Sequence, residues 1–302
     1  MNDAQRLHQS HFDTLPALTL RAPGRINLIG DHTDYCGLPV LPMAIAEGID
    51  IAVAENIAPF TRATSTLDGE VFDSRLRIRP RGWARYVAAV LTELADLAPD
   101  RGATIAIDGD LPPTGGLSSS SALAVGCVFA LAALWEIAAT PSQLVDLAVA
   151  AGRRAAIAGG AMDQTVIAHA TPGAALRIDF DPPHLNHVAV PADFRWVAAY
   201  SGTAAPKGGS AADAYNSFVL ASRAAARLLG DASPSPQLSR VREASARDQA
   251  GLPTMKVAEA AALVDGDDLG LPGDAMLDLR VSAEHVLAEA ARVDAAEHAM
   301  RQ

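Results

Sequence analysis

Cysteine and long apolar runs are both scarce in this sequence. Only Cys36 and Cys127 are present, one beside a polar segment and the other inside an apolar one. Two scattered cysteines are too few for a disulfide framework or a zinc site, so a reduced, cytoplasmic environment is expected. The longest apolar run, from Ala122 to Trp135, is shorter than the roughly 18 residues that a membrane-spanning helix needs, which predicts a core helix.

Basic clusters and a recognisable leader are also missing. The formal net charge is -11, and no Lys/Arg run is suited to lie along a phosphate backbone. Nucleic acids and anionic membrane surfaces are therefore poor candidates for partners. The segment from Met1 to Phe12 lacks a basic stretch followed by an apolar run, so we expect no secretory signal. Small-molecule chemistry fits this composition better.

The length of 302 residues and an apolar share of 50% predict two domains with cores of ordinary size. We expect the boundary near residue 194, which gives domains 1–194 and 195–302. The periodicity predicts both strands and helices. The predicted strands are 17–20, 49–55, 103–107, 174–180 and 194–200, with a hairpin around Asp68-Gly69 inside 61–78 and a turn at 181–187. The predicted helices are 83–97, 122–135, 140–157, 211–229, 256–264 and 281–300, with a capping box between Thr140 and Gln143 and a polar linker at 230–249.

A glycine- and serine-rich loop lies between a predicted strand and the apolar helix. Gly115 and Gly116 allow close approach of a phosphate to the backbone, and the hydroxyls from Ser118 to Ser121 add donors. Backbone N-H groups and a helix N-terminus that converge in this way attract anions. The loop has no Walker-type lysine, and a plain flexible turn is the alternative interpretation.

Two further segments concentrate polar groups. The stretch from Ala22 to Ile45 brings Arg25, Asp31, His32 and Asp34 together between apolar residues. Each of them alone would more often be a turn former on a surface hairpin, but as a set they favour a polar binding site. The third segment presents one carboxylate, Asp163, after a glycine-rich turn; taken alone, that residue is more typical of a helix N-cap.

In this order and spacing, the three segments resemble the galactokinase family of the GHMP superfamily, and the likeness extends over nearly the whole chain. The resemblance implies an α+β, two-domain GHMP kinase fold, with a ribosomal protein S5 domain 2-like N-terminal domain and an incomplete ferredoxin-like C-terminal domain. It also implies ATP-dependent phosphorylation of the C1 hydroxyl of galactose or a close hexose, with ATP and Mg²⁺ as cofactors, by a monomer.

The resemblance further implies a role for individual residues. Asp34 would bond ring hydroxyls of the sugar, Asp31 and His32 would contact its hydroxymethyl end, and Gly160 and Tyr215 would complete the pocket. Asp163 would face the C1 hydroxyl, to take its proton or to orient it, with Arg25 steadying the phosphoryl charge. The implied ATP-binding residues are Gly115, Gly116, Leu117, Ser118, Ser119, Ser120, Ser121 and Trp83, with Ser120 as the Mg²⁺ ligand.

The chain also departs from the family pattern. Asp31 stands where Glu is usual, Ala151 aligns with the metal-binding Glu, and Phe218 replaces an Arg. The sequence stops at Gln302 before a third glycine-rich motif, so we expect a fragment or a shortened paralogue with part of its ATP site open to water. A non-catalytic sugar sensor with the same fold is the rival hypothesis, and a GHMP kinase acting on another small alcohol is a weaker one.

Overall fold

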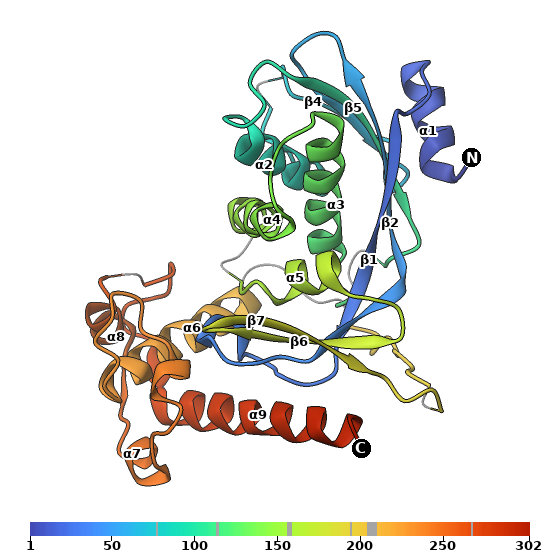
Figure 1. Cartoon of the computed structure of the whole chain (residues 1–302). Coiled ribbons are helices and arrows are strands. Elements are labelled where there is room, and N and C mark those ends of the chain that lie inside the picture. Colours follow the sequence, from blue (N-terminus) through green and yellow to red (C-terminus); the bar gives the residue numbers. More distant parts are fainter. Residues whose placement is uncertain (77, 113–114, 156–158, 194, 204–209, 267) are drawn as a thin grey trace. The chain divides into compact units, whose positions relative to one another are not determined.

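The computed structural model describes residues 1–302 apart from 77, 113–114, 156–158, 194, 204–209 and 267 (Figure 1). The chain divides into two compact units that alternate along the sequence. Unit 1 comprises Met1–Ile26, Ala44–His169 and Ala199–Ala205. Unit 2 comprises Asn27–Met43, Ala170–Ala198 and Pro206–Gln302. The chain thus enters unit 2 early and returns, whereas the sequence predicted one boundary near residue 194.

Unit 1 is built on a sheet of strand order β1-β2-β5-β3-β4. Its strands are β1 (Leu18–Asn27), β2 (Pro42–Asn56), β3 (Arg62–Ser65), β4 (Val71–Asp73) and β5 (Gly102–Gly109). Its helices are α1 (Asp3–Phe12), α2 (Ala84–Leu94), α3 (Ser119–Leu134), α4 (Pro141–Ala155) and α5 (Met162–His169). Strands β2 and β5 run antiparallel, with Ile49 opposite Gly109, while β3 runs parallel to β5.

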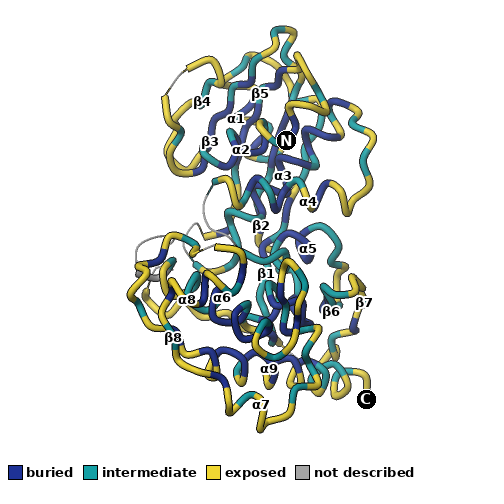
Figure 2. Tube along the Cα trace, turned by 90° about the vertical axis from the view of Figure 1, so that its left-hand side faces the viewer, coloured by how far each residue is buried: buried dark blue, intermediate teal, exposed yellow. Residues whose placement is uncertain are grey.

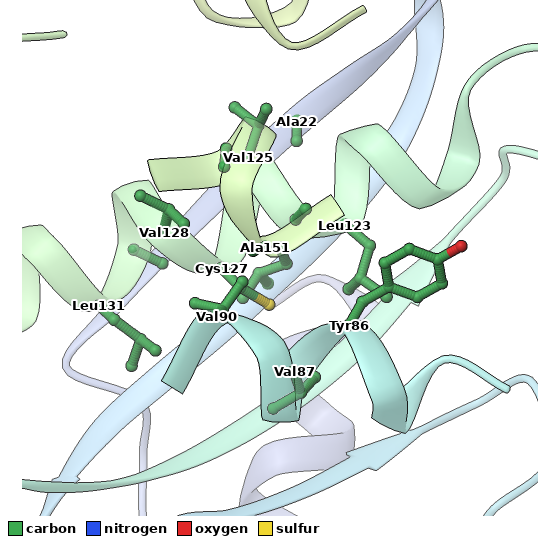
Figure 3. Packing of buried hydrophobic residues seen from close by; sticks show 14 of the residues in the cluster. Ala22, Tyr86, Val87, Val90, Leu123, Val125, Cys127, Val128, Leu131 and Ala151 are labelled. Carbon is green, nitrogen blue, oxygen red and sulfur yellow. The ribbon is translucent and has the colours of Figure 1, made fainter. Parts of the chain in front are cut away.

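The two faces of this sheet are covered by different helices. Ile51 and Val53 of β2 belong to a large apolar cluster with α2, α3 and α4, whereas the intervening Ala52 contacts Ala4 of α1. This alternation follows from the period of two in a strand. Helix α3 is buried along most of its length, and Figure 3 shows its side chains packed against Val87 and Val90 of α2. The apolar run therefore forms a core helix, as predicted.

Unit 2 contains a two-stranded hairpin and a group of helices. The hairpin pairs β6 (Ala174–Phe180) with β7 (Pro183–Ala189), and β8 (Thr254–Lys256) pairs with β9 (Met276–Asp278). The helices are η1 (Asp34–Cys36), α6 (Ser210–Leu228), η2 (Leu238–Val241), α7 (Ala246–Ala250), α8 (Val257–Leu263) and α9 (Leu279–Met300). One apolar cluster joins α6, α8 and α9, and a second sets Val293 of α9 against Leu41, Ala175 and Val188.

Several predicted elements are confirmed. The bounds of β6 are those predicted, and α4 begins with the expected capping box, in which the Gln143 N-H donates to Thr140 Oγ1 at 3.3 Å and Gln143 Oε1 accepts the Thr140 N-H at 2.8 Å. The predicted end of this helix, residue 157, lies outside the described residues. The hairpin of β3 and β4 is present. Because β3 ends at Ser65 and β4 begins at Val71, its turn is longer than the two-residue type expected. Of Asp68 and Gly69, only Gly69 has a positive φ, +68°.

Three predictions were wrong. Residues 181–187 are largely strand rather than turn, because Phe180 pairs with Pro183 and only Asp181 and Pro182 are needed to reverse the chain. The described residues 195–200 of the predicted last strand have no regular secondary structure. The linker at 230–249 contains η2 and most of α7, and α1 was not foreseen.

Figure 2 shows mostly buried residues along β5 and α3 and mostly exposed residues at the connecting loops. Among the residues that the structure describes, no helix combines the length and the apolar character needed to cross a bilayer.

Candidate active site

The loop between β5 and α3 carries the predicted phosphate-binding residues. Gly115 is half-buried, whereas Gly116 is exposed and has a φ of +74°, and a Cβ added there would meet no atom within 4 Å. The range from Ser119 to Ser121 forms the first turn of α3, where N-H groups and the helix dipole favour an anion. Residues 113–114 of the loop lie outside the described part of the chain. The backbone at Gly116 and the start of α3 is therefore suited to a phosphate group.

Asp163 lies in the first turn of α5 and is engaged at both carboxylate oxygens. Its Oδ1 accepts a hydrogen bond from Arg25 Nε at 2.6 Å. Its Oδ2 accepts the hydroxyls of Ser118 and Ser121 at 2.5 and 3.2 Å. The side chain is 24% exposed, so it remains open to an incoming hydroxyl. The carboxylate of Asp163 thus lies at the same helix start that favours phosphate.

Arg25, near the end of β1, links this carboxylate to the loop. Besides bonding Asp163, its guanidinium donates from Nη1 to the Gly116 carbonyl oxygen at 2.9 Å. Its backbone N-H donates to the Leu117 carbonyl oxygen at 3.2 Å. Arg25 and Asp163 are 138 positions apart in sequence, yet the fold of unit 1 joins them. A cation, a carboxylate and an anion-favouring helix start are among the parts that phosphoryl-transfer sites use.

Three other positions that the sequence singled out, Gly160, Trp83 and Ala151, also belong to unit 1. Gly160 is half-buried just before α5. Trp83 is 7% exposed in the apolar core, and its Nε1-H donates to the Asp68 carboxylate at 2.9 Å, so its contact with ATP stays a prediction. Ala151 is fully buried against the helices of the core (Figure 3).

The donor set for a metal ion is small. Within the described residues, no group of three or more His, Cys, Asp or Glu side chains is arranged to hold an ion. Mg²⁺ usually keeps several waters and uses one or two protein carboxylates together with substrate phosphates. Ser120, the predicted Mg²⁺ ligand, lies in the first turn of α3. The Ser120 contact stays a prediction.

The remaining predicted residues belong to unit 2, and His32 is the centre of an aromatic group there. Its ring stacks on Phe218 with a centroid distance of 5.0 Å, and the ring of Tyr215 lies 5.6 Å away. Its Nδ1 lies 2.7 Å from the Tyr35 hydroxyl. His32 itself has a φ of +64°, in the left-handed region that non-glycine residues seldom adopt. The fold therefore holds this imidazole in one orientation.

The electrostatic surroundings keep this group neutral at neutral pH. Burial, followed by the charge of His285, lowers the pKa of His32, and Asp31 opposes this only in part. Burial also raises the pKa of Tyr35 far above its usual range, so the phenol stays protonated. A neutral imidazole can accept a hydrogen bond from the Tyr35 hydroxyl at Nδ1, which leaves an N-H at Nε2 for another partner.

The two acidic residues beside His32 differ in exposure. Asp31 is exposed, and its Oδ1 accepts a hydrogen bond from Asn27 Nδ2 at 3.1 Å. Asp34 is half-buried at the start of η1. Exposed and half-buried carboxylates are acceptors that sugar hydroxyls can use.

Three residues that contact the segment from Gly30 to His32 were not predicted from the sequence: Tyr35, and Glu289 and His285 of α9. Tyr35 directly follows the predicted Asp34, so its place in the same polar stretch could have indicated it. Glu289 lies 259 positions from Gly30, and no local pattern indicates that contact.

Comparison with family models gives two matches. Residues 6–55 match the galactokinase galactose-binding signature, and residues 85–171 match the GHMP kinases N terminal domain. The first match includes Arg25 and the His32 segment, and the second includes the glycine-serine loop and Asp163.

Curated relatives and a solved structure agree with these matches. A galactokinase of Chloroflexus aurantiacus is 33% identical over 301 residues, covering 97% of this chain and 70% of the relative. A galactokinase of Chloroflexus aggregans is 34% identical over 200 residues, covering 64% of this chain and 51% of the relative. The structure of Lactococcus lactis galactokinase complexed with galactose superposes with a TM-score of 0.67 at 22% identity, covering 93% of this chain and 69% of that one, which supports the fold.

Proposed function

The chain belongs to the galactokinase family, a family of sugar kinases, and from this membership we propose that it transfers the γ-phosphoryl group of ATP to the C1 hydroxyl of galactose or a close hexose. The observation that carries the proposal is the cluster of Arg25, Ser118, Ser121 and Asp163 at the start of α3. Its partners in this reaction are small molecules, ATP and a sugar.

Asp163 acts on the attacking hydroxyl in this mechanism. Each carboxylate oxygen has more than one lone pair, so a sugar hydroxyl can join the bonds already made by Arg25 and the serines. The hydroxyl gives up its proton as its oxygen bonds to the γ-phosphorus, and the bond from that phosphorus to the β-γ bridging oxygen breaks to release ADP. Asp163 orients the hydroxyl and accepts the proton.

The other residues bind and neutralise charge. The Arg25 guanidinium lies between the Asp163 carboxylate and the Gly116 carbonyl, where it can offset charge on the transferring group. Backbone N-H groups near Gly116 and the α3 start bind the phosphates. Mg²⁺, when bound with ATP, neutralises phosphate charge, and Ser120 is the protein oxygen proposed to contact it. Asp31, His32, Asp34 and Tyr215 are the residues proposed to bind the sugar, with Gly160.

The proposal predicts that Asp163→Asn loses about 10²-fold or more of kcat, the scale of a positioned base. The assay is coupled ADP release with a panel of hexoses, beside thermal shifts with sugar and with ATP. A matched control is Asp110→Asn, because Asp110 pairs with Arg21 on the same strand as Arg25 and has no proposed role. Its kcat should stay near wild type. Turnover of Asp163→Asn within about tenfold of wild type would contradict the assignment.

One observation favours a second candidate, a non-catalytic sugar sensor. Ala151 occupies the position aligned with the metal-binding Glu and is fully buried in the core, so no carboxylate comes from there. The same assay separates the two functions. Thermal stabilisation by sugar without ADP release from any hexose would support the sensor and exclude the kinase.

A further inference from the structure

Glu289 is a buried carboxylate of unit 2 outside the proposed catalytic and binding residues. It lies on α9 and is 8% exposed. Its Oε1 accepts the backbone N-H groups of Gly30 at 2.9 Å and Asp31 at 3.2 Å. Its Oε2 accepts a hydrogen bond from Arg292 Nε at 2.7 Å. A single side chain thus satisfies two consecutive N-H groups of the segment that carries the predicted sugar-binding residues.

A second side chain of α9 contacts the same segment. His285 lies one helical turn before Glu289, and its Nε2 is 3.2 Å from the Asp31 carbonyl oxygen. A carbonyl only accepts hydrogen bonds, so this nitrogen carries the proton. Helix α9 therefore holds Asp31 from both sides, at its N-H through Glu289 and at its C=O through His285.

The segment held in this way has an unfavourable backbone. Gly30 has a φ of +108° and His32 a φ of +64°. A Cβ at Gly30 would lie 2.8 Å from the Val40 Cα, so only glycine fits there. The buried Thr33 hydroxyl adds bonds to the Gly30 and Pro39 carbonyls at 2.9 and 2.7 Å. Residues in such conformations persist only where surrounding contacts fix them, and Glu289 supplies two of those contacts.

The Glu289 carboxylate is ionised at neutral pH. Burial by itself raises its pKa, but the Gly30 N-H, Arg292 and the Asp31 N-H lower it by more, so the pKa lies below the ordinary value. An ionised acceptor forms stronger hydrogen bonds to backbone N-H groups than a neutral one.

We propose that Glu289 is a positioning residue for sugar recognition, which fixes the Gly30–Asp31 backbone so that Asp31 and His32 present their side chains to the sugar. This inference rests on the proposed function, because it takes these two residues as sugar ligands. It adds a residue from the far end of the chain to that function and assigns its action to the backbone rather than to the substrate.

The test compares two glutamates of one helix. Glu289→Ala leaves two backbone N-H groups without their acceptor, and we expect KM for galactose to rise about tenfold or more while KM for ATP changes little. Glu289→Gln keeps an acceptor oxygen and should recover most of the loss. The matched control is Glu297→Ala, since Glu297 is similarly buried and bonds Arg177, Asn186 and Arg301 instead of the Gly30 segment.

A general loss of stability gives a different result. It would affect both alanine variants alike, so thermal unfolding is measured beside the kinetics, and amide hydrogen exchange at Gly30 and Asp31 is followed in both. Faster exchange at these amides and a raised galactose KM in Glu289→Ala alone support the proposal. Equal effects of Glu289→Ala and Glu297→Ala on galactose KM, or unchanged exchange at both amides, overturn it. A wild-type chain that turns over no hexose refutes the proposed function itself, before any variant is compared.

Discussion

Ser118 combines an unfavourable backbone with a short hydrogen bond to Asp163. It precedes α3 with a φ of +61°, and its hydroxyl donates to Asp163 Oδ2 at 2.5 Å. In the left-handed region a Cβ costs about 1 kcal/mol, a cost that glycine does not carry. The fold thus accepts local strain at a residue whose hydroxyl orients the proposed catalytic carboxylate.

This strain predicts different outcomes for two substitutions at the same position. Ser118→Gly and Ser118→Ala both remove the hydroxyl, so both should lower kcat to a similar degree. Ser118→Gly should be the more stable of the two by about 1 kcal/mol in free energy of unfolding, because only glycine is relaxed at this φ. Denaturant unfolding beside the ADP-release assay measures both effects. Equal stability of the two variants would show that the backbone is not strained there.

The residues that sequence could predict are those whose signal is local. Arg25, the glycine-serine loop and Asp163 were singled out because their short segments together resemble a family pattern, and the structure brings them into contact, while their roles stay predictions. Phe218 was noted only as a missing Arg, and its stacking on His32 depends on the approach of α6 to a distant segment. Glu289 could not be predicted, because Glu residues on helices are mostly exposed and its burial depends on partners that are distant in sequence.

At the scale of elements, the two helical glycines of unit 1 differ in what surrounds them. A Cβ at Gly126 in α3 would lie 2.3 Å from Ile51 Cδ1 and 3.1 Å from Ala22 Cβ, where the helix packs on β1 and β2. A Cβ at Gly152 in α4 would meet only the end of the Gln164 side chain, at 3.3 Å. Close contact of α3 with the sheet therefore depends on Gly126.

Substitution by alanine should separate these two glycines. Both changes gain about 1 kcal/mol of helix propensity. Gly126→Ala overpacks a core in which Ile51 is fully buried, at a cost of about 1–3 kcal/mol, so the net loss in free energy of unfolding is expected to reach about 2 kcal/mol. Gly152→Ala should be neutral or stabilising. Chemical denaturation of both variants is the measurement, and a Gly126→Ala protein as stable as wild type would mean that α3 can shift freely on the sheet.

Elements with strong periodicity were predictable, and those with ambiguous composition were not. The capped start of α4 and the apolar run of α3 carry explicit signals. Strand β7 does not, because Pro183, His184 and Asn186 are residues typical of turns. Its strand state comes from pairing with β6, in which Leu185 lies opposite Ile178. Tertiary pairing overrides local propensity there.

For the whole molecule, the division into units depends on which core each segment joins. Leu28, Ile29 and Leu41 pack with Val293 of α9, so the early segment Asn27–Met43 belongs with the end of the chain. An apolar residue shows that it will be buried but not which partner buries it. A single boundary was therefore the simplest inference from sequence, and the interleaving could come only from the structure.

Unit 2 contains carboxylates whose ionised form the fold stabilises. Burial by itself raises the pKa of Glu297, but Arg301 and Arg177 lower it by more. Burial likewise raises the pKa of Asp231, and hydrogen bonds from the backbone N-H groups of Gln237 and Ser233 lower it by more. With Glu289, these groups have folded-state pKa values below their ordinary ones. Their contribution to stability is present above the unfolded-state pKa, near 4.5 for Glu, and is lost as pH falls through the folded-state value.

The free energy of unfolding should therefore decline as pH drops below about 5, while it stays nearly constant from pH 6 to 7 as far as these carboxylates are concerned. Urea unfolding at several pH values between 7 and 3.5 measures the decline. Glu297→Gln cannot titrate, so it should be less stable than wild type at pH 7 and lose less stability on acidification. If wild type and Glu297→Gln lost the same stability between these pH values, the Glu297 ion pairs with Arg177 and Arg301 would not contribute to acid sensitivity.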